Sequence, residues 1–193
     1  MVILGITGGI GSGKSFISSL FREQLNVPVY DCDTEAKHLM NEDKALQQQL
    51  KQLVGTHVYK AGKLQKSVLA DYLFSDQQHA QKVNAIVHPA VKDDFRKWAG
   101  QQKVGVVAIE SAILYESGFD SVADKVIFVD APQELRIQRV MQRDGSTRQQ
   151  VEARINMQRT EEQRHKADYI IMNENAQQEV LLSALQEILK IIN

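Results

Sequence analysis

The sequence is poor in cysteine and proline and contains no long apolar run. Cys32 is the single cysteine among 193 residues, which excludes an internal disulfide and suits a reducing compartment. No apolar run approaches the roughly 20 residues that a membrane-spanning helix needs, and the N-terminus lacks the basic start and cleavage site of a signal peptide. We therefore expect a cytoplasmic protein with no membrane partner.

Charge and histidine content argue against two further classes of function. The formal net charge of -1 provides no basic field for a nucleic-acid duplex, so we expect no nucleic-acid partner. The five histidines show no close pairing of the kind that a zinc site needs.

The chain is long enough to bury the core of one α/β domain. We expect a monomer or a weak homo-oligomer.

What the sequence does contain is a glycine-rich stretch near its start. Gly8–Ser15 fits the phosphate-loop pattern G-x-x-x-x-G-K-[ST], and it follows the apolar run Val2–Ile6. Its amides, the N-terminus of the next helix and the Lys14 ammonium would all attract a polyphosphate. A glycine-rich turn that binds nothing is the alternative, and the agreement of strand, loop and helix disfavours it. We predict that a nucleoside triphosphate is bound by Gly11, Ser12, Gly13, Lys14, Ser15 and Phe16, with Mg²⁺ on Ser15.

Apolar runs alternate with helical patterns along the rest of the chain. This alternation predicts an α/β fold with a parallel five-stranded sheet and helices on both sides. The expected strands are 2–6, 27–30, 104–109, 125–129 and 169–172. Beyond the first helix, which begins near Lys14, the expected helices are 34–54 with an interruption near Asn41, 68–73, 76–87, 89–98, 133–144, 147–166 and 180–189.

We interpret the chain as one domain, 1–193, with two specialised segments. The core is expected to comprise residues 1–54, 101–138 and 167–193. Three helical pieces without an intervening strand suggest an insertion at about 55–100, where Pro89 should begin a new helix. Residues 139–166 are expected to form an arginine-rich lid, with a hinge at Gly145.

Acidic residues end two of the predicted strands, where ligands of parallel sheets bind. Asp31 and Asp33 follow the second strand, and in an extended chain both carboxylates would lie on one side. One could accept a proton from an attacking hydroxyl while another holds Mg²⁺ through water. The alternative is that Asp33 only caps the next helix. Glu110 ends the third strand and could also hold Mg²⁺ through water, or it could simply begin a solvated loop.

Three arginines recur at i, i+3 and i+7 in the segment 133–144. Arg136, Arg139 and Arg143 would repel one another in an isolated helix by a few tenths of a kcal/mol per pair. This repulsion is explained if an anion binds there, and the alternative is a water-screened exposed face. Further arginines follow at Arg148, Arg154, Arg159 and Arg164. A closing lid of arginines could neutralise a phosphoryl group in transfer and exclude water.

Together these residues resemble the dephospho-coenzyme A kinase family of P-loop kinases, almost from end to end. The loop alone is common to many families, and its combination with the other segments is more specific. The matching segments are Gly5–Ser15, Tyr30–Asp33, His88-Pro89, Gln138–Asp144, and Ala167–Ile170 with Asn173.

The resemblance implies ATP-dependent phosphorylation of the ribose 3′-hydroxyl of dephospho-coenzyme A. It implies that Asp33 is the general base, and that Lys14 and Ser15 bind phosphate and Mg²⁺. Catalytic roles then fall to Asp33, Lys14 and Arg143, and nucleotide contacts extend to Arg139 and Asn173. The acceptor would be bound by the insertion and by Asp31, Asp33, His88 and Glu110, although His88 on spacing alone is only a residue before a proline.

Two positions depart from the pattern of that family. Phe16 stands where threonine is usual after the Lys-Ser pair, so a hydroxyl contact to the α-phosphate is lost. Ala112 stands where proline is usual in the segment 110–116. Neither change removes a charge that catalysis requires.

Two alternative functions stay open on the sequence. The first is another small-acceptor P-loop kinase, acting on a nucleoside monophosphate or on shikimate. The second is an ATP-dependent switch or adaptor protein, which would have no need for a base beside the loop. The guanine motif N-K-x-D is absent, which argues against a GTPase.

Overall fold

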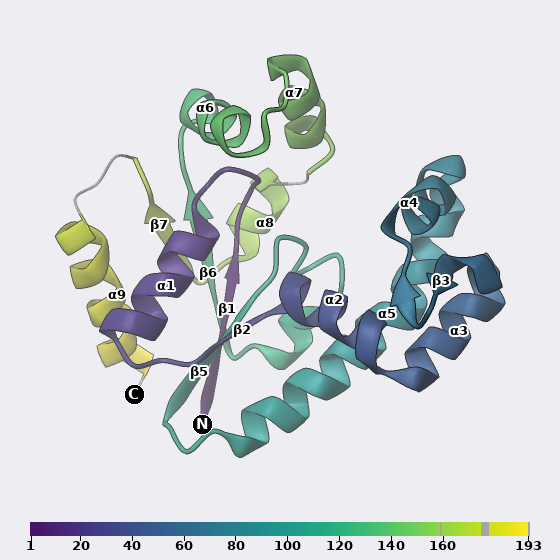
Figure 1. Ribbon diagram of the computed structural model, residues 1–193. Coiled ribbons are helices and arrows are strands. Elements are labelled where there is room, and N and C mark those ends of the chain that lie inside the picture. The colour runs from purple at the N-terminus through teal and green to yellow at the C-terminus, as the bar shows by residue number, and fades with distance from the viewer. Residues whose placement is uncertain (159, 175–177, 193) are drawn as a thin grey trace. The chain divides into compact units, whose positions relative to one another are not determined.

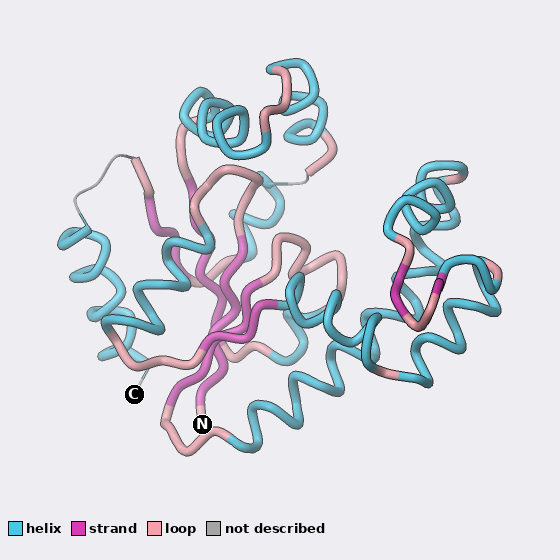
Figure 2. The backbone as a smooth tube through the Cα atoms, in the orientation of Figure 1, coloured by secondary structure: helices cyan, strands magenta, loops and turns pink. Residues whose placement is uncertain are grey.

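A five-stranded sheet forms the centre of the fold (Figures 1 and 2). The computed structural model describes residues 1–158, 160–174 and 178–192. The strands are β1 (Val2–Thr7), β2 (Val29–Asp31), β5 (Val106–Glu110), β6 (Lys125–Asp130) and β7 (Tyr169–Met172), in the order β2-β5-β1-β6-β7. The strand β1 pairs in parallel with β5 and β6, and β6 pairs in parallel with β7. The predicted parallel sheet of five strands is therefore confirmed.

The central position of β1 fixes where the phosphate loop begins. Leu4 and Ile6 of β1 are fully buried, as are Ala108 of β5 and Ile127 of β6, and all four belong to one core cluster. Val107 and Ile109 of β5, which alternate with Ala108, are fully buried as well, so β5 is apolar on both faces, as strands inside a parallel sheet are. The helices α1 (Lys14–Gln24) and α9 (Gln178–Ile192) add their apolar faces to the same core cluster. The loop 8–13 thus leaves the carboxyl end of the central strand and leads directly into α1.

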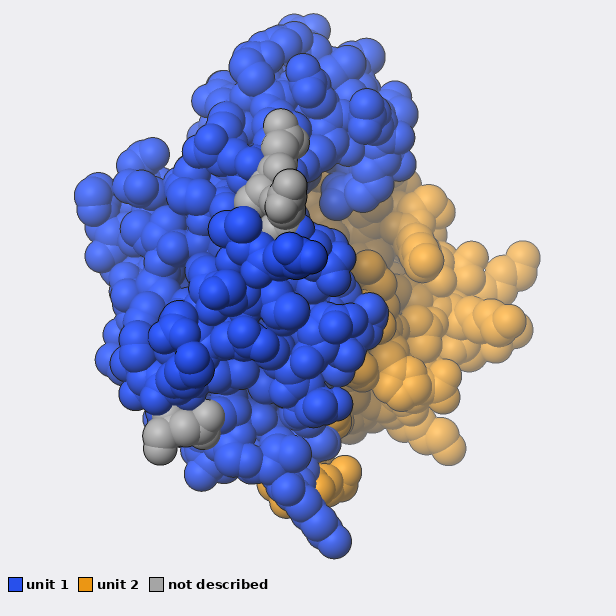
Figure 3. All heavy atoms as spheres, turned by 90° about the vertical axis from the view of Figure 1, so that its left-hand side faces the viewer, with its two compact units in different colours: residues 1–30, 102–193 blue, residues 31–101 orange. Residues whose placement is uncertain are grey.

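The chain divides into two compact units (Figure 3). The first comprises Met1–Tyr30 and Gln102–Asn193, and the second is the continuous segment Asp31–Gln101. The helical insertion expected at 55–100 therefore belongs to a unit that begins at residue 31. The second unit contains α2 (Cys32–Glu42), α3 (Lys44–Val54), the 3₁₀ turn η1 (Thr56–Val58), the short strands β3 (Tyr59–Lys60) and β4 (Lys63–Leu64), α4 (Lys66–Ser75) and α5 (Gln77–Gln101).

The expected break at Pro89 is wrong, because α5 continues through it. Val83, Val87, Val91, Phe95 and Ala99 are all buried, and their spacing of four residues makes one apolar stripe across the proline. Proline in a helix removes one hydrogen bond and clashes with the carbonyl four residues earlier, at a cost of about 3 kcal/mol. Packing of the continuous stripe outweighs that cost. Pro89 itself lies on the exposed side of the helix.

Two other segments differ from the predicted elements. The segment between the expected helices 34–54 and 68–73 contains the hairpin of β3 and β4, whose strands are only two residues long. The expected helix 147–166 is two helices, α7 (Arg148–Asn156) and α8 (Thr160–Lys166). The helix α7 ends at Asn156, with Met157 as its C-cap, and the side chain of Gln158, in the bend that follows, accepts a hydrogen bond from the Ile10 amide. The predicted helix 133–144 is confirmed as α6 (Gln133–Asp144).

Candidate active site

The phosphate loop has the backbone that only glycine accommodates at its critical positions. Gly13 is the N-cap of α1 and has φ of +94°. A Cβ atom there would lie 2.1 Å from the Asn173 amide nitrogen, and one on Gly8 would lie 2.2 Å from the Val129 carbonyl oxygen. Because the loop packs so closely against the ends of β6 and β7, its amides are held in a fixed arrangement. A fixed set of amides at a helix N-terminus suits a polyphosphate.

Lys14 places its charge over the loop. Its Nζ donates to the carbonyl oxygen of Gly8 at 2.9 Å and to that of Gly9 at 3.2 Å. Lys14 is the first residue of α1 and directly follows Gly13, the last glycine of the loop. Its ammonium group therefore lies close to the loop carbonyls. The ammonium and the helix N-terminus thus stand at the same end of α1, where both favour a bound anion.

Ser15 and Glu110 form the candidate magnesium site. Ser15 lies in the first turn of α1 and Glu110 ends β5, and the Ser15 hydroxyl donates to Glu110 Oε1 at 3.1 Å. Glu110 is only 7% exposed, so it does not begin a solvated loop. A hydroxyl and a carboxylate are oxygen ligands, and Mg²⁺ typically takes one or two protein ligands beside phosphate and water. This donor set fits the ion that the loop motif implies.

The three arginines of α6 lie in three different environments, so neither expectation for the stripe describes all of them. Arg136 is only 6% exposed and donates from Nε to the Ile10 carbonyl oxygen at 2.9 Å. Arg139 donates from Nη2 to the Asn173 carbonyl oxygen at 3.1 Å. Arg143 is paired with Asp144 at 2.7 Å, and the ion pair raises the pKa of Arg143.

A hollow of about 150 Å³ joins the loop to α6. It brings together most of the residues predicted to bind nucleotide, and it places Phe16 at its wall in a position that is 41% exposed. Its lining residues are Gly11, Gly13, Lys14, Ser15, Phe16, Arg139, Val140 and Arg143.

Asn173 and Ser12 support this hollow from within the fold. The Asn173 amide donates from Nδ2 to the Ser12 carbonyl oxygen at 2.8 Å, and both residues are buried. Asn173 follows β7 directly, so the loop after β1 is tied to the end of an outer strand of the sheet. The side chain of Asn173 is therefore committed to the loop backbone.

Sequence reasoning missed two contacts at the tip of the loop. Gln158 Oε1 accepts from the Ile10 amide at 2.7 Å, and nothing in the sequence around residue 158 indicated this. The sequence predicted that Arg136 shares a stripe with Arg139. It did not predict that Arg136 is buried against the loop. The spacing of three and seven residues put these arginines on one face but could not show what that face meets.

The aspartates of the second unit are arranged differently from the expectation for an extended chain. The helix α2 begins at Cys32, so residues 31 and 33 do not alternate as in a strand. Asp31 is the N-cap and accepts from the amides of Asp33 and Thr34 at 3.0 and 3.1 Å. The cap considered for Asp33 is therefore made by Asp31, and Asp33 is exposed.

His88, the other residue of this unit predicted to bind the acceptor, is half-buried in α5. Burial lowers its pKa, and the positive charge of Lys92 lowers it further.

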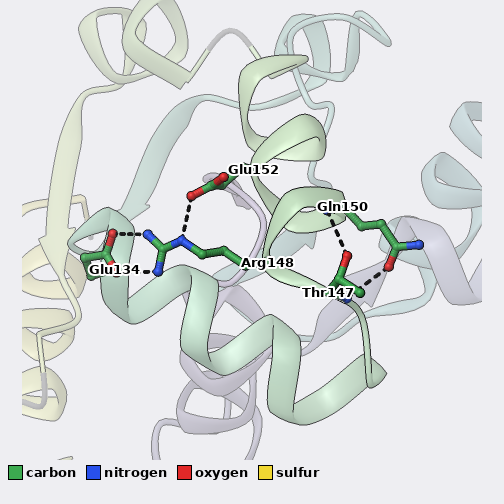
Figure 4. Close-up of polar contacts among 5 residues, drawn as sticks. All are labelled: Glu134, Thr147, Arg148, Gln150 and Glu152. Carbon is green, nitrogen blue, oxygen red and sulfur yellow. Dashed lines mark hydrogen bonds and ion pairs between the residues drawn. The ribbon is translucent and has the colours of Figure 1, made fainter.

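The remaining arginines of the expected lid are paired with carboxylates. Arg148 lies between Glu134 of α6 and Glu152 of α7 (Figure 4), with contacts of 2.5 and 2.8 Å. Thr147 and Gln150 form a capping box that starts α7 (Figure 4). Arg154 pairs with Asp144, and Arg164 pairs with Asp130. Arg159, also named in the lid, lies outside the described residues.

Two classes of feature are missing from the part of the chain that the structure describes. Within residues 1–158, 160–174 and 178–192, no group of three or more His, Cys, Asp or Glu side chains could hold a metal ion. Over those same residues, no helix is both long and apolar enough to cross a membrane.

Comparisons with known proteins agree with this geometry. The family model described as dephospho-CoA kinase matches residues 2–179. A dephospho-CoA kinase of Bacteroides fragilis is 43% identical over 173 residues, covering 89% of this chain and 84% of the relative. One from Porphyromonas gingivalis is 43% identical over 175 residues, covering 90% and 86%.

Solved structures show the same architecture. A crystal structure from Thermus thermophilus has a TM-score of 0.83 at 32% identity and covers 100% of this chain and 98% of its own. A dephospho-CoA kinase from Campylobacter jejuni has a TM-score of 0.73 at 24% identity, with coverages of 99% and 98%. A shikimate kinase from Bacteroides thetaiotaomicron, at 18% identity and a TM-score of 0.60 with coverages of 98% and 98%, shares the fold alone. The loop, the sheet that carries it and these matches together establish that the chain belongs to the dephospho-CoA kinase family.

Proposed function

We propose that this protein transfers the γ-phosphoryl group of ATP to the ribose 3′-hydroxyl of dephospho-coenzyme A, with Mg²⁺, giving coenzyme A and ADP. The observation that carries the proposal is the Ser15–Glu110 contact beside the glycine loop, in a chain that the family model matches over residues 2–179. Phosphoryl transfer depends mainly on positioning and on electrostatic stabilisation. The described side chains of the loop supply both.

On the nucleotide side, the residues of the first unit bind and neutralise the polyphosphate. The amides at the N-terminus of α1 and the Lys14 ammonium would contact the phosphates, while Ser15 and Glu110 would hold Mg²⁺. ATP supplies the group that is transferred, and Mg²⁺ offsets the negative charge of its phosphates. Arg139 and Arg143 line the same hollow, where their charges would stabilise the phosphoryl group in transfer. Arg143 would exchange its partner Asp144 for phosphate.

On the acceptor side, the second unit would bind dephospho-coenzyme A. Asp33 is exposed and carries no cap hydrogen bond, because Asp31 accepts from the helix amides instead. An exposed carboxylate that is free of a structural role can orient the 3′-hydroxyl and accept its proton. His88 and Asp31 of this unit are further residues we propose for acceptor binding, together with Glu110, which lies in the first unit beside the proposed Mg²⁺.

The acceptor is identified by measuring ADP release with a panel of hydroxyl acceptors. The panel contains dephospho-coenzyme A, AMP, CMP and shikimate, with a reaction that lacks an acceptor as the baseline. We expect release above the baseline with dephospho-coenzyme A alone. Equal rates in all five reactions would refute the kinase assignment, and a preference for AMP, CMP or shikimate would identify a different acceptor class.

The role of Asp33 is tested by Asp33→Asn. We expect turnover to fall by roughly a hundredfold or more, with the ATP affinity nearly unchanged, because a general base contributes in the transition state rather than to nucleotide binding. Steady-state kinetics measures turnover, and calorimetry with ADP, which binds at the same site without reacting, measures the nucleotide affinity. Asp31→Asn makes the same chemical change two residues earlier and keeps a competent helix cap. Asp71→Asn, at an exposed position of the same unit, is the control. Unchanged turnover in Asp33→Asn would refute the assignment.

A further inference from the structure

Arg136 is held against the backbone of the phosphate loop. Its Nε donates to the Ile10 carbonyl oxygen at 2.9 Å. A Cβ atom on Gly9 would lie 2.1 Å from its Nη2 atom, so the guanidinium occupies the space that the absence of a side chain on Gly9 leaves. Ile10 also packs against a small cluster of Ile137, Val140, Val151 and Ile155 from α6 and α7. The guanidinium is therefore fixed at the tip of the loop.

The charge of Arg136 is buried without an ion pair. Arg136 is 6% exposed, and its Nη2 atom has no hydrogen-bond partner in the described structure. Within that same part of the chain Arg136 makes no ion pair: burial lowers its pKa, and Asp130, at a greater distance, opposes this shift only in part. Asp130 is itself paired with Arg164 at 3.0 Å. Despite the lowered pKa of Arg136, a guanidinium stays protonated in proteins.

Arg139 of the same helix also donates to backbone carbonyl oxygens, but it is only partly buried, and three other arginines of the segment are paired. Arg143, Arg148 and Arg164 each contact a carboxylate. A buried cation without such a partner costs free energy, and its field is stronger than that of an exposed charge because water does not screen it. Two further buried polar atoms at the loop, Thr7 Oγ1 and Ser12 Oγ, also have no partner among the described residues.

We propose that Arg136 is a positioning residue whose uncompensated charge is matched by the polyphosphate bound in the loop. Its hydrogen bond to Ile10 holds the guanidinium at the loop tip, and the gain in anion affinity comes from its permanent positive charge. The inference rests on the proposed function of the loop as the ATP site, and it assigns the anion affinity partly to a residue outside the loop motif. The apo protein bears the cost of burying this charge, and the bound anion offsets it.

According to the proposal, removing the charge of Arg136 preserves or raises the stability of the ligand-free protein but weakens its affinity for anions. Arg136→Met removes the charge and keeps a long side chain, so the melting temperature without ligand should equal or exceed that of the wild type. Its dissociation constant for inorganic tripolyphosphate should rise about tenfold. Arg136→Lys keeps a charge but loses the guanidinium hydrogen bond, and it should bind within about threefold of the wild type. Arg22→Met, on the exposed side of α1, is the matched control and should behave as the wild type.

Calorimetry gives the dissociation constants, and thermal unfolding with and without tripolyphosphate gives the stabilities. Equal dissociation constants for the wild type and Arg136→Met would overturn the proposal. So would a loss in Arg136→Lys as large as that in Arg136→Met, because the Ile10 hydrogen bond would then be the cause. Arg136→Gln, which is also neutral, replaces Arg136→Met if the latter does not fold. A wild type that binds neither tripolyphosphate nor ADP would refute the proposed function instead, which distinguishes the two failures.

Discussion

Glu110 is the residue that links the sheet to the proposed metal. It ends β5 and is buried, and its Oε1 accepts a hydrogen bond from the Ser15 hydroxyl at 3.1 Å. Glu110→Gln keeps the shape and an oxygen for this hydrogen bond but removes the negative charge. We expect the Mg²⁺ concentration needed for half-maximal rate to rise by about tenfold or more, the effect typical of groups that support a metal.

ADP release titrated with Mg²⁺ at saturating ATP measures this change. Glu23→Gln, an exposed position on α1, is the control. An unaltered Mg²⁺ dependence in Glu110→Gln would contradict the assignment and leave Glu110 as an anchor for the start of α1.

At the residue scale, contiguous chemistry was predictable and long-range contacts were not. Gly11 to Ser15 could be predicted as a site because the motif, its strand and its helix are adjacent in the sequence. The contact between Arg136 and Ile10 joins residues 126 positions apart, and that between Gln158 and Ile10 joins residues 148 apart. Such pairs depend on how β6 and α6 meet the loop, which local patterns do not encode. Asp31 caps the helix instead of Asp33 because α2 begins at Cys32, two residues before the predicted start at residue 34.

At the scale of elements, α5 gives the sharpest test of packing against local propensity. Pro89→Ala restores the amide that can donate to the Ala85 carbonyl, and the helix already runs through this position. We expect the free energy of unfolding to increase by about 1 to 3 kcal/mol. Urea denaturation followed by circular dichroism measures it. Lys92→Ala, one turn further along the same helix, is the reference substitution, and a loss of stability in Pro89→Ala alone would show that the helix needs the proline.

Elements with strong boundaries were predictable from the sequence. The helix 133–144 lies between Pro132 and Gly145, and Gly145 ends it in a left-handed conformation. The strand 169–172 follows a charged helix and precedes Asn173. The hairpin of β3 and β4 was missed because two-residue strands carry no period. The break predicted at Pro89 failed because the buried stripe of α5 is a tertiary effect that a rule about proline does not include.

At the scale of the whole molecule, the two units predict separate responses to the two substrates. If the first unit binds nucleotide and Asp31–Gln101 binds the acceptor, ADP should slow amide hydrogen exchange in residues 8–16 and 136–143. Dephospho-coenzyme A should slow exchange within residues 31–101. The physical reason is that a ligand suppresses local opening of the segments it contacts.

Hydrogen exchange followed by mass spectrometry measures both responses, with shikimate as the control ligand. Protection by dephospho-coenzyme A confined to the first unit would contradict the proposed division of labour. Protection of both units by each ligand alone would contradict it as well.

The insertion of one unit into the other also has a consequence for synthesis on the ribosome. The second unit is a continuous segment, whereas β1 at the N-terminus pairs with β5 and β6, whose residues 106–110 and 125–128 are made much later. The loop is completed later still, when Asn173 emerges and donates to Ser12. Because local contacts form before distant ones, we expect residues 31–101 to fold first. The phosphate loop, although synthesised before that unit, would reach its binding geometry after it.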